Sequence, residues 1–182
     1  MLFEKQNERG LLLNITGNGK GKTTSGLGAC VRALGWDWKV CIIQFIKNSR
    51  VTGEKKFAEL ISRHVDLEMY QTGYGASWKG RGTEPEHIEA ARQAWAQTKE
   101  YIAAGKVDLL MLDELNIALS FGWLDADGVM NTFKNRPASM NIIVTGRNAP
   151  DWLLEISDLV SEIKEIKHPL KKGIPARKGI EF

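Results

Sequence analysis

The amino-acid sequence predicts an α/β fold in which a mostly parallel β-sheet is covered by helices on both faces. Short runs rich in Leu, Ile and Val alternate along the chain with segments of helical periodicity. Most of these runs are too continuously apolar for strands that expose one face to water, and this is typical of strands in a parallel sheet. The alternation of strands and helices favours the same layered arrangement.

The expected strands occupy residues 11–16, 39–46, 65–70, 107–113, 140–145 and 159–166. The expected helices occupy residues 22–34, 53–63, 84–104, 125–136 and 150–156. The helix at 84–104 has Pro85 near its start and Gly105 directly after its end, which are the positions that these residues favour at helix termini. Residues 72–83 and the segment from His168 are expected to be loops, because both are rich in Gly or Pro.

Length and composition indicate one domain. The chain has 182 residues, of which 43% are hydrophobic, and this is enough for one sizeable core. We therefore expect a single domain over residues 1–182, with a short amino-terminal segment at 1–10 and a carboxy-terminal tail at 168–182. The apolar stretches fall far short of the roughly 20 residues that span a bilayer, and the amino terminus is charged rather than signal-like. These features favour a cytoplasmic protein without membrane contact.

Charge and cysteine content limit the kinds of ligand and metal that the protein is expected to bind. The net charge is only +3, and the basic residues concentrate at a few places, which fits local anion binding better than a nucleic-acid surface. Cys30 and Cys41 lie in apolar segments without metal-ligand spacing, so we expect buried thiols rather than a disulfide or a zinc site. The histidines, His64, His87 and His168, are dispersed and suggest neither a metal cluster nor a catalytic dyad.

A glycine-rich segment between the first strand and the first helix has the features of a phosphate-binding loop. Its residues are Gly17, Asn18, Gly19, Lys20, Gly21, Lys22, Thr23 and Thr24. Glycines allow backbone N–H groups to turn towards an anion, Lys22 adds a positive charge, and Thr23 is placed to hold Mg²⁺. The loop is one residue shorter than usual, because Thr16 stands where such motifs have their first glycine. The alternative is a flexible turn without a ligand, but Gly-Lys-Thr-Thr at a helix start has little value for packing.

The strand at 107–113 ends in two carboxylates, Asp113 and Glu114, as Walker B segments do. At the carboxyl end of a parallel strand these side chains lie in the crevice where ligands bind, near the phosphate loop. Their expected role is to hold magnesium. The alternative is that both are solvated turn residues or a cap for the following helix. Together, the two motifs specify a P-loop, RecA-like version of the α/β fold.

Segments spread along the chain also carry a resemblance to one family. Besides the phosphate loop they are Gln-Phe-Ile-Lys at 44–47, Leu-Asp-Glu-Leu-Asn at 112–116, Val-Thr-Gly-Arg-Asn-Ala-Pro at 144–150 and Lys-Gly-Ile-Glu-Phe at 178–182. The chain resembles an ATP:corrinoid adenosyltransferase of the family typified by the cobalamin-adenosylating enzyme of vitamin B12 assimilation. The resemblance covers nearly the whole chain, and the shortened phosphate loop is part of the family's pattern. Generic P-loop ATPases share only the loop and the acidic strand end.

The resemblance implies transfer of the 5′-deoxyadenosyl group of ATP to the cobalt of a corrinoid, with release of triphosphate. Cobalt that has been reduced to Co(I) is the nucleophile, and it attacks the ribose C5′ in line with the departing triphosphate. Enzymes of this kind hold ATP reversed relative to ordinary P-loop NTPases, so that the loop cradles the leaving group. The protein then positions C5′ and stabilises the charge of the triphosphate with backbone amides, cations and Mg²⁺.

The resemblance also assigns roles to individual residues. Residues 17–24 are expected to bind the triphosphate, and Lys22, Thr23 and Glu114 are the expected catalytic contacts. Thr23 and Glu114 are expected to hold Mg²⁺, with Asp113 as the second choice of carboxylate.

Two cations and one aromatic residue complete the implied site. Lys47 and Arg147 follow predicted strands and are expected to neutralise further phosphate oxygens, with solvated surface cations as the alternative. Trp78 matches a glycine-flanked aromatic segment that faces the corrin ring in the family. Ala76 stands where the family commonly has a phenylalanine, and residues 79–81 replace its usual polar and acidic continuation. The alternative for Trp78 is a loop anchor packed on the core.

By analogy with the family, we expect a homodimer and a flavoprotein that reduces the corrinoid. Two other functions stay open at this point. An ordinary P-loop ATPase or kinase would cleave the β–γ bond and release ADP, but the sequence offers no clear residue besides Glu114 to orient an attacking water. A corrinoid carrier gated by ATP would bind its ligand tightly without turnover.

Overall fold

The computed structural model describes residues 9–47, 52–75 and 82–181. Its centre is a six-stranded sheet with the order β3-β2-β4-β5-β1-β6, and every pair of neighbouring strands is parallel. The strands are β1 (Leu12–Thr16), β2 (Val40–Gln44), β3 (Leu67–Gln71), β4 (Leu109–Asp113), β5 (Asn141–Thr145) and β6 (Leu159–Glu162). The predicted α/β fold with a parallel sheet is confirmed.

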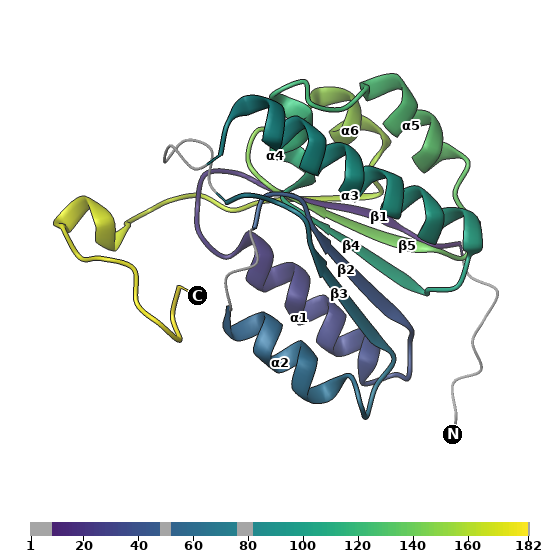
Figure 1. The fold of residues 1–182 in the computed structure, drawn as a ribbon, viewed down its shortest axis with the longest axis horizontal. Coiled ribbons are helices and arrows are strands. Elements are labelled where there is room, and N and C mark those ends of the chain that lie inside the picture. Colours follow the sequence, from purple (N-terminus) through teal and green to yellow (C-terminus); the bar gives the residue numbers. More distant parts are fainter. Residues whose placement is uncertain (1–8, 48–51, 76–81, 182) are drawn as a thin grey trace.

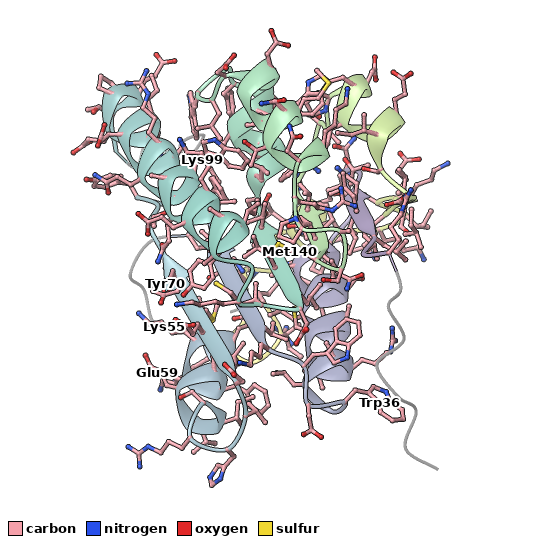
Figure 2. All side chains as sticks on the ribbon, turned by 90° about the vertical axis from the view of Figure 1, so that its right-hand side faces the viewer. Trp36, Lys55, Glu59, Tyr70, Lys99 and Met140 are labelled. Carbon is pink, nitrogen blue, oxygen red and sulfur yellow. The ribbon has the colours of Figure 1, made fainter. Side chains whose placement is uncertain are left out.

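Helices cover both faces of this sheet, as predicted (Figure 1). One face carries α1 (Lys22–Leu34) and α2 (Gly53–Ile61). The other face carries α3 (Glu84–Ala104), α4 (Leu115–Ser120), α5 (Ala126–Lys134) and α6 (Asp151–Ile156). Charged side chains such as Glu59 of α2 and Lys99 of α3 are exposed (Figure 2). None of the helices in the described part of the chain combines the length and apolar character that crossing a membrane requires.

Alternate side chains of the central strands enter two hydrophobic cores. In β2, Cys41 and Ile43 belong to the core under α3 to α6, whereas Val40 and Ile42 belong to the core under α1 and α2. This is the two-residue period of a strand that is covered on both faces. Burial raises the pKa of the Cys41 thiol, and likewise that of Cys30, to about 12. Both cysteines are free and buried, which confirms the prediction of buried thiols without a disulfide.

The strand order brings the two predicted site motifs together. β5 lies between β1, which leads into the glycine-rich loop, and β4, which ends in Asp113. The carboxyl ends of parallel strands meet at one edge of the sheet, where ligands bind in α/β proteins. A single strand therefore separates the phosphate loop from the acidic strand end, as in a RecA-like sheet.

Most observed elements match the predicted ranges to within two residues, and two differences have physical causes. β6 ends at Glu162 rather than near residue 166, because its partner β1 ends at Thr16, opposite Glu162, and then turns into the loop. β6 is also an exposed edge strand, unlike the buried strands at the centre. Residues 115–120 form α4, which was not predicted, because six residues are too few for a helical period to appear in the sequence.

The carboxy-terminal tail leaves the sheet after β6 and turns back so that its end lies near the start of α1 (Figure 1). Its predicted loop contains a 3₁₀ helix, η2 (Pro169–Lys172), in which the side chain of His168 accepts a hydrogen bond from the N–H of Leu170. Near its end, Glu181 forms an ion pair with Lys20 of the glycine-rich loop. The tail is therefore part of the surroundings of that loop.

Candidate functional site

The glycine-rich loop between β1 and α1 has a backbone conformation that glycine permits. Gly17 (φ 97°) and Gly21 (φ 113°) both lie in the left-handed region. A Cβ atom at Gly17 would also come within 2.5 Å of the carbonyl oxygen of Ile163. The helix α1 then begins at Lys22, with no acidic residue in its first turn and no side-chain cap. The backbone N–H groups of this turn are therefore available to an anion.

Lys22 is the buried cation of the loop. It is only 7% exposed, and its Nζ donates a hydrogen bond of 2.7 Å to the carbonyl oxygen of Gly19. Burial lowers the pKa of this ammonium; Arg147 lowers it further, while the carboxylates of Glu114 and Asp113 act in the opposite direction. A phosphate group in the loop would supply the negative charge that favours the charged form of Lys22.

Asp113 joins four elements at the floor of the site. Its Oδ1 accepts hydrogen bonds from the hydroxyls of Thr23, at 2.8 Å, and Thr145, at 2.7 Å. Its Oδ2 accepts a hydrogen bond of 2.7 Å from Nε2 of Gln44 and lies 3.4 Å from Nζ of Lys47. Asp113 is fully buried, so the alternative of a solvated turn residue is wrong for it.

Glu114 follows Asp113 but has fewer partners. Its backbone is in the left-handed region (φ 65°), and its N–H donates to Oγ1 of Thr145 at 3.1 Å. Its Oε2 is buried and has no hydrogen-bond partner among the described residues, and its side chain does not cap α4. Burial, together with the negative charge of Asp113, raises the pKa of Glu114 to about 7, although Lys22 and other nearby cations oppose the shift. Because the side chain of Glu114 makes no cap hydrogen bond, the alternative of a helix-capping side chain is wrong.

A buried pair of side-chain amides supports the turn after β5, which carries Arg147. Asn14 of β1 and Asn116 of α4 exchange hydrogen bonds of 3.2 and 3.0 Å through their side chains. Asn116 also donates to the carbonyl oxygen of Gly146 at 3.1 Å. Gly146 (φ 133°) is the residue before Arg147, so the amide pair fixes the turn from which Arg147 extends.

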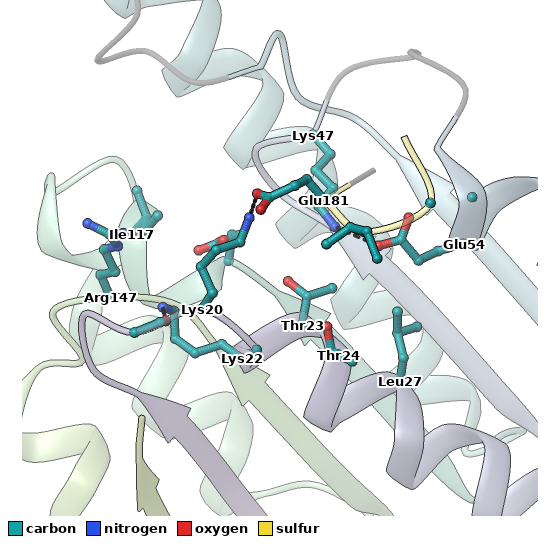
Figure 3. A pocket seen from close by; sticks show the side chains of 16 residues that line it. Lys20, Lys22, Thr23, Thr24, Leu27, Lys47, Glu54, Ile117, Arg147 and Glu181 are labelled. Carbon is teal, nitrogen blue, oxygen red and sulfur yellow. Dashed lines mark hydrogen bonds and ion pairs between the residues drawn. The ribbon is translucent and has the colours of Figure 1, made fainter. Parts of the chain in front are cut away.

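A cavity of about 480 Å³ lies over these residues (Figure 3). Cavities that bind small molecules span roughly 300–1,000 Å³. Its lining includes loop residues 19–24, the cations Lys47 and Arg147, the carboxylates Glu54 and Glu114, and tail residues 179–181. The cavity has the size and the basic character that a nucleotide triphosphate requires.

The structure brings most of the predicted site residues together. Of the phosphate loop, residues 19–24 line the cavity, whereas Gly17 and Asn18 do not. Lys47 is half-buried and contacts Asp113, which excludes a purely solvated role. Arg147 is exposed, yet it also lines the cavity.

Sequence reasoning assigned no role to several residues of the site. Gln44 and Glu181 lay in segments used for the resemblance, but their contacts with Asp113 and Lys20 appear only in three dimensions. Glu54 stood in a predicted helix and carried no motif. The sequence gives only a weak indication that these three residues share a site, because each comes from a different element.

The central residues of the predicted corrin-facing loop, Ala76 and Trp78 included, lie outside the described part of the chain. On the described side, the N–H of Gly73 donates to the carbonyl oxygen of Lys47 at 3.1 Å. The N–H of Gly75 donates to the carbonyl oxygen of Ile46 at 2.8 Å. The loop is therefore attached to the backbone segment that carries Lys47.

A row of aromatic rings continues from this loop. Tyr74 packs edge-on against His87, at 6.2 Å between ring centroids, and His87 stacks on Trp123 at 5.3 Å. Trp123 in turn stacks on Phe121 at 5.0 Å. His87 and Trp123 are buried, while Tyr74 and Phe121 are exposed at the two ends. The row ties the loop to the start of α3 and to the segment after α4.

The fold and the site together define a P-loop nucleotide-binding protein. A parallel strand leads into a glycine-rich loop at a helix start, and a buried acidic strand end lies beside it. Comparison with known proteins identifies the family. The family model described as ATP:corrinoid adenosyltransferase BtuR/CobO/CobP matches residues 8–182. The chain belongs to this family, as the resemblance predicted.

Curated relatives agree with this assignment. The chain is 41% identical to a corrinoid adenosyltransferase of Pseudomonas aeruginosa, over 100% of this chain and 88% of the relative. It is 37% identical to a corrinoid adenosyltransferase of a Sinorhizobium species, over 100% and 85% of the two chains. It is 34% identical to the corrinoid adenosyltransferase of Escherichia coli K12, over 98% and 89%. The chain is therefore an enzyme of this type.

A solved structure shows the same fold at a greater distance. The flagellar accessory protein FlaH of Methanocaldococcus jannaschii superimposes with a TM-score of 0.57, over 85% of this chain and 71% of that chain. The two sequences are 14% identical. At this level the likeness concerns the fold alone.

Proposed function

We propose that this protein transfers the 5′-deoxyadenosyl group of ATP to the cobalt of a reduced corrinoid and releases triphosphate. The observation that carries the proposal is the cavity that joins the phosphate loop to the cations Lys20, Lys22, Lys47 and Arg147. The electron pair of Co(I) forms the bond to C5′, while the pair of the C5′–O5′ bond leaves with the triphosphate. The protein then has to hold the charge that accumulates on the leaving group and keep C5′ in line with cobalt.

The residues of the phosphate loop are suited to this leaving group. The open N–H groups at the start of α1 and the buried ammonium of Lys22 supply positive charge at one wall of the cavity. Lys47 and Arg147 supply it at two other points (Figure 3). Because Lys22 is hydrogen-bonded to the carbonyl oxygen of Gly19 and Lys47 lies 3.4 Å from Asp113, little reorganisation of these two cations is needed as charge develops on the triphosphate.

The residues at the floor of the cavity fit a magnesium ion. Thr23, Asp113 and Glu114 offer hydroxyl and carboxylate oxygens, the ligands that Mg²⁺ prefers, and Oε2 of Glu114 is buried without a partner. Among the described residues, no group of three or more His, Cys, Asp or Glu side chains is arranged to hold a metal ion. We therefore propose that Thr23 and Glu114, with Asp113, hold Mg²⁺ together with phosphate oxygens and water. When bound, the ion would neutralise charge on the triphosphate.

Three further features are proposed from the family. A flavoprotein would reduce the corrinoid, the enzyme would be a homodimer, and it would act in the cytoplasm. Trp78 is proposed to face the corrin ring, and the exposed ring of Tyr74 is a second candidate for this contact. ATP hydrolysis and corrinoid transport without chemistry are the alternatives that the assay below separates from adenosyl transfer.

The proposal is tested by an anaerobic assay with MgATP and chemically generated cob(I)alamin. The corrinoid spectrum reports formation of the cobalt–carbon bond, and the phosphate product is identified separately. We expect adenosylcobalamin and triphosphate in equal amounts. Lys22→Ala should lower the rate by about 100-fold or more, because it removes a charge that contacts the leaving group.

The matched control is Lys99→Ala, which removes an exposed lysine of α3 that does not line the cavity (Figure 2). Its rate should stay within about twofold of the wild type. ADP and phosphate without a cobalt–carbon bond would make the protein an ATPase. Tight corrinoid binding without turnover would make it a carrier. Either result contradicts the proposed function.

A further inference from the structure

His87 is a buried histidine in the first turns of α3. It is only 3% exposed, and its ring stacks on that of Trp123 with 5.3 Å between the centroids and 9° between the planes. Trp123 belongs to the hydrophobic core under α3. His87 also meets the exposed ring of Tyr74 edge-on, at 6.2 Å between centroids. The imidazole therefore joins an exposed aromatic ring to the core.

Both described ends of the predicted corrin-facing loop lie at His87. Tyr74 lies before the undescribed residues 76–81, and Gly82 follows them. The backbone of Gly82 is in the left-handed region (φ 72°), and a Cβ atom there would lie 3.0 Å from Nε2 of His87 and 3.1 Å from Cβ of Tyr74. The two ends are thus close to each other and to the same imidazole. His87 lies at the base of the loop, where the chain leaves the fold and rejoins it.

Backbone contacts fix the first end of the loop to the wall of the nucleotide cavity. The N–H groups of Gly73 and Gly75, on either side of Tyr74, donate to the carbonyl oxygens of Lys47 and Ile46. Gly73 is packed so closely that a Cβ atom would come within 2.2 Å of the carbonyl oxygen of Ile46. Lys47 lines the cavity, so the backbone that carries Tyr74 has a fixed place relative to a bound nucleotide.

The start of α3 fixes the second end. The N–H of Thr83 donates a hydrogen bond of 2.6 Å to Oε2 of Glu86, as part of a capping box. His87 is the next residue, and its N–H donates to the carbonyl oxygen of Thr83 at 3.1 Å. The imidazole therefore extends from a capped helix turn and rests on the core through Trp123.

The proposed reaction gives His87 no chemical step. The electron pair of Co(I) forms the bond to C5′, and triphosphate leaves with the pair of the broken bond, so no side chain has to supply or accept a proton. His87 does not line the cavity either. Its contacts support a role in positioning.

Tyr74 is the group that His87 can position. Its ring is 47% exposed, so a flat ligand can pack on it while the contact with His87 persists. We propose that His87 is a positioning residue that holds Tyr74 against the corrin ring, at a fixed distance from the ATP bound beside Lys47. The spacing of the two substrates determines whether cobalt is in line with C5′. This inference rests on the proposed function, because it takes ATP and a corrinoid as the ligands.

The test measures the KM for cob(I)alamin and the KM for ATP in the anaerobic assay. His87→Ala should raise the KM for cob(I)alamin by about 5- to 10-fold, the scale of one aromatic contact. The KM for ATP and the affinity for inorganic triphosphate should stay within about twofold of the wild type, because His87 does not line the cavity. His87→Phe, which keeps a flat ring between Tyr74 and Trp123, should restore most of the lost corrinoid affinity.

A double-mutant cycle tests whether His87 acts through Tyr74. Tyr74→Ala alone should raise the KM for cob(I)alamin by about 5- to 10-fold. In that background His87→Ala should raise it by less than about twofold further, because the ring that His87 positions is gone. Effects of the two substitutions that multiply would overturn the inference, and so would an unchanged KM for cob(I)alamin in either single variant.

The matched control is Thr98→Ala, which changes another buried side chain of α3. Thr98 is fully buried, and its hydroxyl donates to the carbonyl oxygen of Ala94 at 2.8 Å. Both KM values of this variant should stay within about twofold of the wild type. If Thr98→Ala raised the KM for cob(I)alamin as much as His87→Ala does, the effect would reflect a general loss of packing in α3, and the inference would fail.

The outcomes also separate this inference from the proposed function. If the wild type forms adenosylcobalamin yet His87→Ala keeps both wild-type KM values, the role of His87 fails and the reaction stands. If the wild type forms no adenosylcobalamin, both fail together.

Discussion

Thr23 in the first turn of α1 donates a hydrogen bond of 2.8 Å to Asp113 at the end of β4. The two residues are 90 positions apart in the sequence, yet this bond fixes the start of the phosphate loop's helix against the acidic strand. The same carboxylate oxygen accepts from Thr145, so β5 is fixed as well. Asp113 therefore organises the floor of the cavity in addition to its proposed place near Mg²⁺.

The first prediction follows from this network. Asp113→Asn should lower the free energy of unfolding by about 2 kcal/mol, because the amide has one acceptor oxygen for partners that now use two. The remaining donors, among them Gln44 and Lys47, would face an NH₂ group. Urea unfolding at pH 7 measures the change. Asp66→Asn, at an exposed position, should stay within about 0.5 kcal/mol of the wild type, and equal stability of both variants would contradict the argument.

The second prediction concerns pH and the metal-free protein. Burial raises the pKa of Glu114 from 4.5 to about 7, so the folded state binds this proton more tightly than the unfolded state. The stability that this group contributes is fully present below pH 4.5 and is lost as the pH rises through about 7. Glu114→Gln removes the titration. The variant should therefore be more stable than the wild type at pH 8 by on the order of 2–3 kcal/mol, with little difference at pH 4.5.

Unfolding curves between pH 4.5 and 8, recorded with a chelator, measure this difference. Glu100→Gln, on the exposed side of α3, serves as the control and should follow the wild-type curve. If the Glu114→Gln curve ran parallel to the wild type over the whole range, Glu114 would titrate normally in the folded protein. Added Mg²⁺ should reduce the advantage of the variant, because a cation favours the ionised carboxylate.

The parts of the site that could be predicted from the sequence are those whose residues lie next to one another in a motif. The glycine-rich loop and the pair Asp113 and Glu114 combine several chemical signals within a few residues. Gln44 and Thr145 were not recognised as partners of Asp113, although both lie at the ends of predicted strands. Their contact depends on the strand order, because β2 and β5 flank β4, and the sequence alone does not specify that order.

The fold shows the same division between local and non-local information. Helix α3 was predicted with its observed bounds, because Pro85 and Gly105 mark its ends locally. The end of β6 was not predicted correctly, because it depends on the residue at which β1 stops pairing with it. Glu54 and Glu181 were missed for a similar reason: each is an ordinary helix or tail carboxylate until the fold places it in the cavity.

The third prediction tests the conformation of the phosphate loop. Gly17→Ala should lower both the stability, by about 1–3 kcal/mol, and the affinity for ATP, because alanine at φ 97° is strained and its Cβ would come within 2.5 Å of the carbonyl oxygen of Ile163. Gly28→Ala is the matched control. Gly28 lies in α1 with no atom within 4 Å of an added Cβ, so alanine there should raise the stability by about 0.5–1 kcal/mol. Urea unfolding and calorimetric titration with ATP measure both variants; a Gly17→Ala protein that binds ATP normally would show that the loop tolerates the change.

The fourth prediction concerns the tail. Glu181 forms an ion pair with Lys20, and both residues line the cavity, so this carboxylate competes with phosphate for the same cation. Glu181→Gln should therefore strengthen the binding of inorganic triphosphate by about two- to fivefold at low ionic strength, and the gain should shrink in high salt, where exposed charges are screened. Titrations at two salt concentrations measure this effect, with Glu100→Gln as a charge-matched control on the far side of the sheet. Weaker binding by Glu181→Gln would instead mean that the carboxylate holds Lys20 in the position that triphosphate needs.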